Sequence, residues 1–210
     1  MNAAFVGFGE LGGQLHNLVQ ETLGQPIVIT CFDDTLTPDG KTVFPFKNYV
    51  DEKFNQHNFF IGLGYKYLEQ KNEILNLLQN RGNKLPSIIH SSCYVSAKAI
   101  IKAACYLYPL CNIDKGVVIE KGVLLNNSVT ISHDCHIGEC CYLSPGVILS
   151  GGVTIGENTF IGSGAVLSNG IKIGKNVIIG IGSVVTKDVP DNASVIGNPA
   201  VVLPAKLNIK

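Results

Sequence analysis

The chain has 210 residues, of which 46% are hydrophobic and 15% charged, and its formal net charge is zero. This length allows one large domain or two modest ones. The charged residues form no Lys/Arg-rich run, so a small-molecule partner is favoured over nucleic acid or an anionic membrane. No apolar stretch reaches the roughly 18 residues of a membrane span, and the start, MNAAFVGFGE, lacks the basic residues of a secretory signal. A cytoplasmic protein without membrane insertion is therefore expected.

Residues 1–88 show the alternation of strand and helix that is typical of half a Rossmann-type fold. A strand is predicted over Ala3–Val6, and it is followed by a G-x-G-x-x-G loop and a helical pattern. A second strand, 27–32, leads into two aspartates, and a third, 59–63, leads into a glycine. A second helix is predicted to close at 80–82. The helical patterns rest on Leu15, Leu18 and Val19, and on Leu68, Ile74, Leu77 and Leu78.

This arrangement predicts a nucleotide site at the strand ends. The loop glycines are Gly7, Gly9 and Gly12, and the pair Asp33 and Asp34 follows about twenty residues later, where a Rossmann-type half grips a ribose hydroxyl. Gly9, Asp33, Asp34 and Gly64 are therefore predicted to bind a nucleotide. In the alternative, the glycines serve only a tight turn in an α/β cap. Fewer than ninety residues cannot build both halves of a dinucleotide site, so an NAD enzyme is not expected.

Residues 89–190 carry a sixfold repeat. From Ile89 to Val185 every sixth residue is Ile, Leu or Val, seventeen in succession. The position four residues after each of these holds small or β-branched residues in nearly every case. Two inward positions per hexad suit a chain wound round a narrow prism, with one short strand per face and three hexads per coil.

The seven cysteines fit this interior better than a metal site. The string HDCHIGECC brings Cys135, His136, Cys140 and Cys141 together, but its spacing matches no common zinc pattern. Five cysteines occupy the compact inward position, where a thiol behaves as a small hydrophobe. They are Cys93, Cys105, Cys111, Cys135 and Cys141. Cys140 is predicted to face outward, but as a nucleophile it lacks an adjacent base. No metal is expected.

His133 and Asp134 are the candidate catalytic pair. The third position of each hexad faces outward, and it holds Asn127, His133 and Glu139 in successive hexads. An imidazole beside a carboxylate on a rigid surface can act as a general base, because its ordinary pKa lies near the operating pH. The alternative is a solvated surface histidine. Gly151 lies eighteen residues after His133, which predicts that it is one coil above on the same face.

The order of these parts resembles that of the hexapeptide-repeat acyltransferases. Within this family the resemblance is to the sialic acid O-acetyltransferases and nucleotide-sugar N-acetyltransferases. The matching segments are NNSVTISHDCHIGE, LSPGVILSGGVTIG and GNPA. The resemblance implies a Rossmann-like half domain (1–88), a left-handed parallel β-helix (89–190), a C-terminal tail (191–210) and a homotrimer with acetyl-CoA between subunits. His133 would then be the base, Asp134 its partner, and the Gly151 N–H the oxyanion donor. Acetyl-CoA contacts would fall on Tyr142, Gly151, Ser163, Gly180 and Ile181, and a sugar contact on Asn126.

The chain departs from the family pattern at two places. Relatives often have a histidine nine residues after the base, where this chain has Tyr142, which can still donate one hydrogen bond. They also often have a histidine near the first glycine loop, where this chain has Glu10 and Leu11. Glu10 and Leu11 are therefore expected near the substrate, and they leave its identity open.

The resemblance thus implies direct acetyl transfer from acetyl-CoA to the amino group of a nucleotide-linked amino sugar. A 4-amino-4,6-dideoxyhexose carried by UDP, dTDP or GDP is the expected acceptor. The alternatives are O-acetylation of sialic acid or another sugar hydroxyl, a metal-dependent hydratase on the same scaffold, and a sugar-nucleotide sensor in which the dyad has no catalytic role. The hydratase would need three histidines, and the repeats contain only His133 and His136 after the entry coil.

Overall fold

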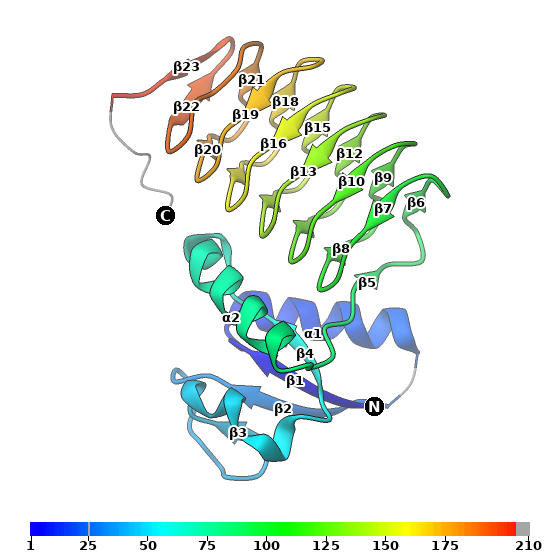
Figure 1. The fold of residues 1–210 in the computed structure, drawn as a ribbon, viewed down its shortest axis with the longest axis vertical. Coiled ribbons are helices and arrows are strands. Elements are labelled where there is room, and N and C mark those ends of the chain that lie inside the picture. Colours follow the sequence, from blue (N-terminus) through cyan, green and yellow to red (C-terminus); the bar gives the residue numbers. More distant parts are fainter. Residues whose placement is uncertain (25, 205–210) are drawn as a thin grey trace. The chain divides into compact units, whose positions relative to one another are not determined.

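The computed structural model describes residues 1–24 and 26–204, and the chain divides into two compact units, Met1–Ile88 and Ile89–Lys210 (Figure 1). Residues 205–210 of the expected tail lie outside the described residues. No described helix combines the length and the apolar character needed to cross a membrane.

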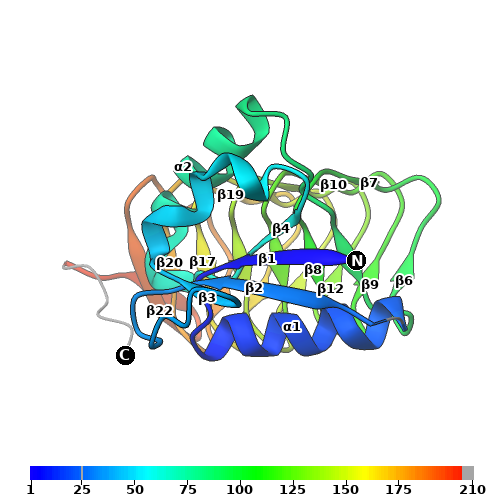
Figure 2. The same cartoon turned by 90° about the horizontal axis from the view of Figure 1, so that it is seen from below.

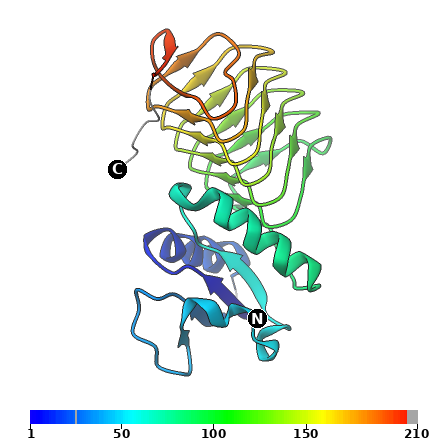
Figure 3. The ribbon, with the colours of Figure 1, turned by 60° about the vertical axis from the view of Figure 1, so that its left-hand side comes forward.

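The first unit is built on a four-stranded parallel sheet with the order β3-β2-β1-β4. Helices α1 and α2 lie on one face of this sheet, and the short 3-10 helices η1 and η2 lie on the other (Figures 1 and 3). Figure 2 shows α1 running alongside β1 and β2. The elements are β1 (Asn2–Val6), α1 (Glu10–Leu23), β2 (Val28–Phe32), β3 (Val43–Phe44), η1 (Phe46–Val50), η2 (Glu52–Phe54), β4 (Asn58–Ile61), η3 (Tyr65–Tyr67) and α2 (Leu68–Asn80).

Three details of this unit differ from the sequence expectation. Strand β3 has only two residues, too few to give an alternating pattern, and it was not expected. Strand β4 ends at Ile61 and not at 63, and residues 62–64 connect it to η3 without regular secondary structure. Leu77 is exposed, and Leu75 faces the core in its place, since the buried side of α2 follows the spacing of 68, 71, 75 and 78.

Glycines let the first loop pack tightly against the end of β4. A Cβ on Gly12 or on Gly62 would collide with the carbonyl oxygen of Gly7. Gly7 itself has a φ of +81°, in the left-handed region that glycine adopts without strain. These three glycines therefore have a packing role, whereas a Cβ on Gly9 or Gly64 would meet no atom within 4 Å.

The second unit is a parallel β-solenoid whose coils stack one on the next (Figure 3). Its strands form three sheets that wind round a common core. One has the order β19-β16-β13-β10-β7, the second β23-β22-β20-β17-β14-β11-β8-β5, and the third β21-β18-β15-β12-β9-β6. Paired residues differ by eighteen, as in Ile100, Val118 and His136, so the coil length inferred from the hexads is confirmed.

Nearly all of these strands have two residues each. The first sheet contains β7 (Ile100–Ile101), β10 (Val118–Ile119), β13 (His136–Ile137), β16 (Thr154–Ile155) and β19 (Lys172–Ile173). The second contains β5 (Ile88–Ile89), β8 (Tyr106–Leu107), β11 (Leu124–Leu125), β14 (Tyr142–Leu143), β17 (Phe160–Ile161), β20 (Ile178–Ile179), β22 (Ser194–Gly197) and β23 (Ala200–Val202). The third contains β6 (Tyr94–Val95), β9 (Asn112–Ile113), β12 (Thr130–Ile131), β15 (Ile148–Leu149), β18 (Val166–Leu167) and β21 (Val184–Val185).

The interior of the solenoid follows the two predicted inward positions. From Cys105 to Val195 a continuous cluster of buried aliphatic residues and cysteines fills it, and Ile89, Cys93, Val95, Ala99 and Ile101 of the entry coil are only partly buried. The inward placement of the five cysteines is confirmed. Cys140, which was expected to face outward, is not part of this interior cluster, but it is fully buried and lies at a corner with a φ of +55°.

Residues after Pro190, expected as a tail, include two further strands. Strand β22 pairs in parallel with β20, and β23 then turns back and pairs antiparallel with β22. The segment 194–202 is therefore part of the solenoid sheet, and the hexad period alone did not reveal it because the antiparallel strand does not follow that period.

Candidate active site

The His133–Asp134 pair lies at the corner between β12 and β13, which we name the dyad corner (residues 132–135 and 150–153). The Asp134 Oδ2 lies 2.9 Å from Nδ1 of His133, and the two side chains are 66% and 51% exposed. Asp134 has a φ of +58°, a conformation that aspartate tolerates better than most residues. This turn directs the carboxylate back to the imidazole of the preceding residue.

Two glycines from adjacent coils flank the pair. A Cβ built on Gly151 would lie 2.5 Å from Nε2 and 2.6 Å from Cε1 of His133, so the imidazole packs directly against Gly151. A Cβ built on Gly116 would collide with Oδ1 of Asp134, so the carboxylate lies over that glycine. Sequence analysis did not single out Gly116, although its position eighteen residues before Asp134 was a usable signal.

Gly151 also has an N–H that the solenoid ladder does not use. Its carbonyl accepts from the Gly170 N–H at 2.9 Å, and the Gly152 N–H donates to the His133 carbonyl at 2.9 Å. Across residues 1–24 and 26–204, no acceptor forms a hydrogen bond with the Gly151 N–H. A backbone donor beside Nε2 of an imidazole is the combination that acyl transfer requires.

Asn126 and Tyr142 meet at a different corner, which joins the second sheet to the third and which we name the Asn126 corner (residues 126–129, 144–147, 162–165 and 180–183). The Asn126 Nδ2 donates to the Tyr142 Oη at 3.2 Å, and the Tyr142 ring centroid lies 5.8 Å from that of Phe160. The Asn127 N–H donates to the Asn126 Oδ1 at 2.8 Å. Tyr142, at the position where relatives often have a histidine, is thus held by Asn126 through a hydrogen bond and by Phe160 through a ring contact.

Ser163, Gly180 and Ile181 belong to the Asn126 corner as well. Ser163 and Ile181 are exposed and stand one coil apart, with the Gly182 N–H donating to the Ser163 carbonyl at 2.8 Å. The side chain of Ile181 is 71% exposed. Gly180 is buried, and a Cβ there would lie 2.8 Å from the side chain of Ile196.

One chain therefore does not bring all the predicted solenoid residues together. His133, Asp134 and Gly151 lie at the dyad corner, whereas Asn126, Tyr142, Ser163, Gly180 and Ile181 lie at or beside the Asn126 corner. The third sheet, with strands such as β12 and β15, separates the two corners. The hexad register predicted that these residues face outward, but not which of them share a corner.

The predicted nucleotide residues lie at the carboxyl edge of the first unit's parallel sheet. Gly9, Glu10 and Leu11 follow β1 and begin α1; Asp33 and Asp34 follow β2, and Gly64 follows β4. Glu10 and Asp34 are exposed. Strand β1 is central and has β2 on one side and β4 on the other, which is the place where parallel α/β sheets bind ligands.

Asp33 is buried and braces the glycine loop. Its Oδ2 accepts from the Phe8 N–H at 2.5 Å, and its Oδ1 accepts from the Thr35 N–H at 2.7 Å and the Thr35 hydroxyl at 2.5 Å. Burial favours a higher pKa for this carboxyl, but the hydrogen bonds from Thr35, Phe8 and Gly9 outweigh it and hold the pKa below its usual value. Asp34 is exposed, and its Oδ1 accepts from the Phe46 N–H at 2.8 Å.

No group of three or more His, Cys, Asp or Glu side chains within the described ranges is arranged to hold a metal ion. Besides the dyad, the solenoid surface carries a second His–carboxylate pair, His136 Nε2 and Glu120 Oε1, which are 3.2 Å apart.

The comparison with solved structures identifies the family. The acetyltransferase domain of PglB from Neisseria gonorrhoeae is 30% identical, with a TM-score of 0.86, and the match covers 96% of this chain and 99% of that domain. The same domain has been solved in complex with acetyl coenzyme A. The chain belongs to the hexapeptide-repeat acetyltransferases.

Other structures agree with this assignment. PerB from Caulobacter crescentus, solved with CoA and GDP-perosamine, is 25% identical to this acetyltransferase, with a TM-score of 0.86 and 97% coverage of each chain. WeeI from Acinetobacter baumannii is 23% identical, with a TM-score of 0.81 and coverage of 97% and 99%, and supports the fold. A family model described as the GMPPB C-terminal domain matches residues 107–209. None of the curated proteins compared matches the chain.

Proposed function

We propose that this acetyltransferase transfers the acetyl group of acetyl-CoA to the amino group of a nucleotide-linked amino sugar. The observation that carries the proposal is the His133–Asp134 pair packed against Gly151, in a chain that matches PglB and PerB over nearly its whole length. PerB has been solved with GDP-perosamine, a nucleotide-linked amino sugar. The acceptor that fits best is a 4-amino-4,6-dideoxyhexose carried by UDP, dTDP or GDP.

The chemistry follows from the protonation of the dyad. A carboxylate can only accept a hydrogen bond, so the contact with Asp134 places the proton on Nδ1 and leaves Nε2 free to act as a base. As the sugar amine attacks the thioester carbon, Nε2 takes the amine proton, and the Gly151 N–H donates to the developing oxyanion. The tetrahedral intermediate then expels the CoA thiolate, which receives the proton from His133.

We propose a homotrimer as the functional unit. Because the dyad corner and the Asn126 corner stand apart on one solenoid, a cleft containing both requires the dyad corner of one subunit and the Asn126 corner of another. Acetyl-CoA would lie in that cleft, along Tyr142, Ser163, Gly180 and Ile181. Asn126 would face the sugar, and the nucleotide would bind at Gly9, Glu10, Leu11, Asp34 and Gly64, with Asp33 shaping the loop.

A panel of acceptors tests the proposed reaction. Each nucleotide 4-amino sugar is incubated with acetyl-CoA, alongside its matched sugar with a hydroxyl at the same carbon, and thiol release is followed with mass spectrometry of the product. The proposal expects release above the acetyl-CoA hydrolysis background with at least one amino sugar and an amide product. Transfer only to the hydroxyl sugars would instead make the chain an O-acetyltransferase, and no transfer at all would leave a binding protein.

Asp33→Ala is expected to weaken nucleotide-sugar binding through the loop. The substitution removes acceptors for the Phe8 N–H and for Thr35, so the free energy of unfolding should fall by about 1–3 kcal/mol. The KM for the nucleotide sugar should rise while the KM for acetyl-CoA stays unchanged, which steady-state kinetics can check. Asp34→Ala is the matched control for the neighbouring carboxylate, whose loss should not lower stability to the same extent.

Asp33 should make the protein less stable in acid. The folded-state pKa of Asp33 lies below its unfolded value of about 3.9. The ionised Asp33 therefore contributes fully to stability at pH values above its unfolded pKa. This contribution is lost as the pH falls through the lower folded pKa. Asp33→Ala should remove this part of the acid sensitivity, so an unchanged acid unfolding curve would argue against the bracing role.

A further inference from the structure

Several inward cysteines make the same contact with the next coil. In each case the thiol lies near the carbonyl oxygen of the residue fifteen positions later: Cys105 with Glu120 at 3.1 Å, Cys111 with Asn126 at 3.2 Å, and Cys141 with Gly156 at 3.1 Å. The hydroxyl of Thr159 makes the equivalent bond to the Gly174 carbonyl at 2.9 Å. The compact inward position therefore carries hydrogen-bond donors that hold corner carbonyls, in addition to filling the core.

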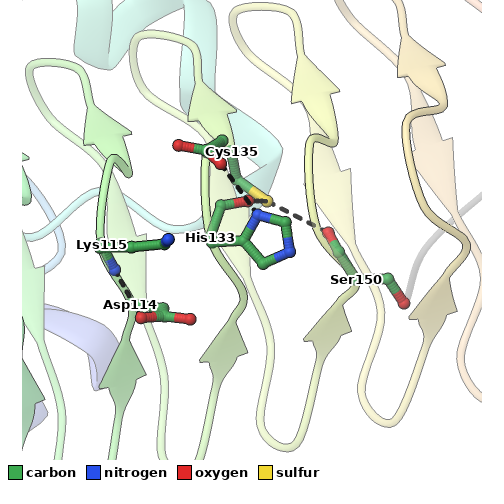
Figure 4. A network of polar contacts seen from close by, with 6 residues as sticks. Asp114, Lys115, His133, Cys135 and Ser150 are labelled. Carbon is green, nitrogen blue, oxygen red and sulfur yellow. Dashed lines mark hydrogen bonds and ion pairs between the residues drawn. The ribbon is translucent and has the colours of Figure 1, made fainter.

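Among the coils stacked above and below the dyad corner, only one has such a donor. The compact position there is occupied by Ala99, Val117, Cys135, Val153 and Ile171 in successive coils, and of these only the cysteine carries a polar hydrogen. Cys135 is 1% exposed, and its Sγ lies 3.2 Å from the carbonyl oxygen of Ser150 (Figure 4). Burial raises the pKa of this thiol, so it remains protonated near neutral pH and can donate.

The carbonyl that Cys135 holds belongs to the peptide that carries the Gly151 N–H. A trans peptide is planar, and its C=O and N–H point in opposite directions. The Ser150 carbonyl points inward to the buried sulfur, so the Gly151 N–H points away from the core, and the His133 imidazole packs against the same glycine. The Gly151 N–H has no acceptor in the described parts of the chain, so the thiol contact is the one described hydrogen bond made by the C=O and N–H of this peptide.

We infer that Cys135 is a positioning residue for the reaction, because its thiol holds the Ser150–Gly151 peptide with the Gly151 N–H directed toward the acyl oxygen. This inference rests on the proposed function, in which that N–H stabilises the oxyanion. Cys135 does not touch either substrate, and its effect should therefore appear in the chemical step and not in substrate binding.

Kinetics of three variants test the inference. Cys135→Val removes the donor but has a side chain that the neighbouring coils already accept at this position, as Val117 and Val153 show. It should lower kcat by about tenfold, a part of the effect of losing an oxyanion donor, with both KM values within about twofold. Cys135→Ser keeps a donor and should restore kcat to within about threefold of the wild type. Cys141→Val removes the same contact at a corner without the dyad, and it should leave kcat unchanged.

Nuclear magnetic resonance tests the peptide orientation without any substrate. The sequence contains only two Ser–Gly dipeptides, Ser150–Gly151 and Ser163–Gly164, so labelling serine carbonyls with ¹³C and glycine nitrogens with ¹⁵N gives two correlated amide signals. The Gly164 N–H donates to the Pro145 carbonyl at 2.9 Å and serves as the internal reference. Cys135→Val should shift the Gly151 signal and leave that of Gly164 in place, whereas Cys141→Val should shift neither.

The outcomes separate this inference from the proposed function. Wild-type kcat in Cys135→Val, an equal loss in Cys141→Val, failure of serine to restore kcat, or an unmoved Gly151 signal would each overturn the positioning role. A wild-type protein that acetylates no amino sugar would overturn the proposed function, and the NMR shifts would still decide whether Cys135 orients the peptide.

Discussion

Replacement of His133 by alanine should lower kcat by about two to four orders of magnitude, the usual contribution of a general base. His133 is the only histidine among residues 132–135 and 150–153, and the Asp134 Oδ2, 2.9 Å from its Nδ1, keeps the imidazole in the tautomer with Nε2 unprotonated. The side chain is half exposed, so its removal should leave folding and assembly intact. Steady-state rates of thiol release, together with size-exclusion chromatography, check both parts of the expectation.

His136→Ala is the matched control for this change. His136 is also exposed on the solenoid surface, three residues further on, but its partner is Glu120 at 3.2 Å on the first sheet. It should retain activity close to that of the wild type. Full activity in His133→Ala, or an equal loss in both variants, would remove His133 as the base.

Gly151→Ala should lower kcat by about two to three orders of magnitude, comparable with the loss of an oxyanion-hole donor. The added methyl group would lie 2.5 Å from Nε2 and 2.6 Å from Cε1 of His133, so the imidazole must leave its position. The backbone of Gly151 does not have a positive φ, so alanine brings no conformational strain and the effect is steric. Rates with saturating substrates measure it.

A control glycine separates this steric effect from a general cost of the substitution. Gly13 lies in α1, where a Cβ meets no atom within 4 Å, and Gly13→Ala should stabilise the helix by up to about 1 kcal/mol without affecting kcat. If Gly151→Ala kept wild-type turnover, His133 would have to act from another position than the one described.

The sequence predicted the solenoid well because one period controls both strand placement and packing. The aliphatic residues of the hexads from Ile89 to Val185 point inward as expected, and the coil length of eighteen correctly predicts that Gly151 lies beside His133. These relations follow from spacing alone, and spacing is what a primary sequence records directly.

The sequence did not predict that two side chains in loops and corners would be buried. Cys140 was expected to face outward from its position in the hexad and does not belong to the interior cluster, but it is fully buried. Asp33 was expected at a nucleotide site, and that role stays a prediction, but the hydrogen bonds that its oxygens accept from Phe8 and Thr35 were not foreseen. Neither loop conformation leaves a periodic signal, because each depends on contacts with residues that are distant in sequence.

The sequence also did not predict that the proposed site residues fall at two different corners. Asn126 and Tyr142 are close to His133 in the chain, but the third sheet lies between their corner and the dyad corner. The hexad register specifies whether a residue is inside or outside, and only its assignment to one of three corners shows that a single copy does not bring the predicted residues together.

The uniform spacing of eighteen has a consequence for how such a chain can change during evolution. Deleting or inserting one residue within the coils would transfer every later inward side chain to the surface, as a register slip does in a strand. Gain or loss of a whole coil would instead preserve every vertical neighbour above and below the change, including Gly116 under Asp134 and Gly151 beside His133. Lineages of this scaffold should therefore differ in height by complete coils, or by loops that bulge from a corner, while the stacked residues of the proposed site keep their spacing.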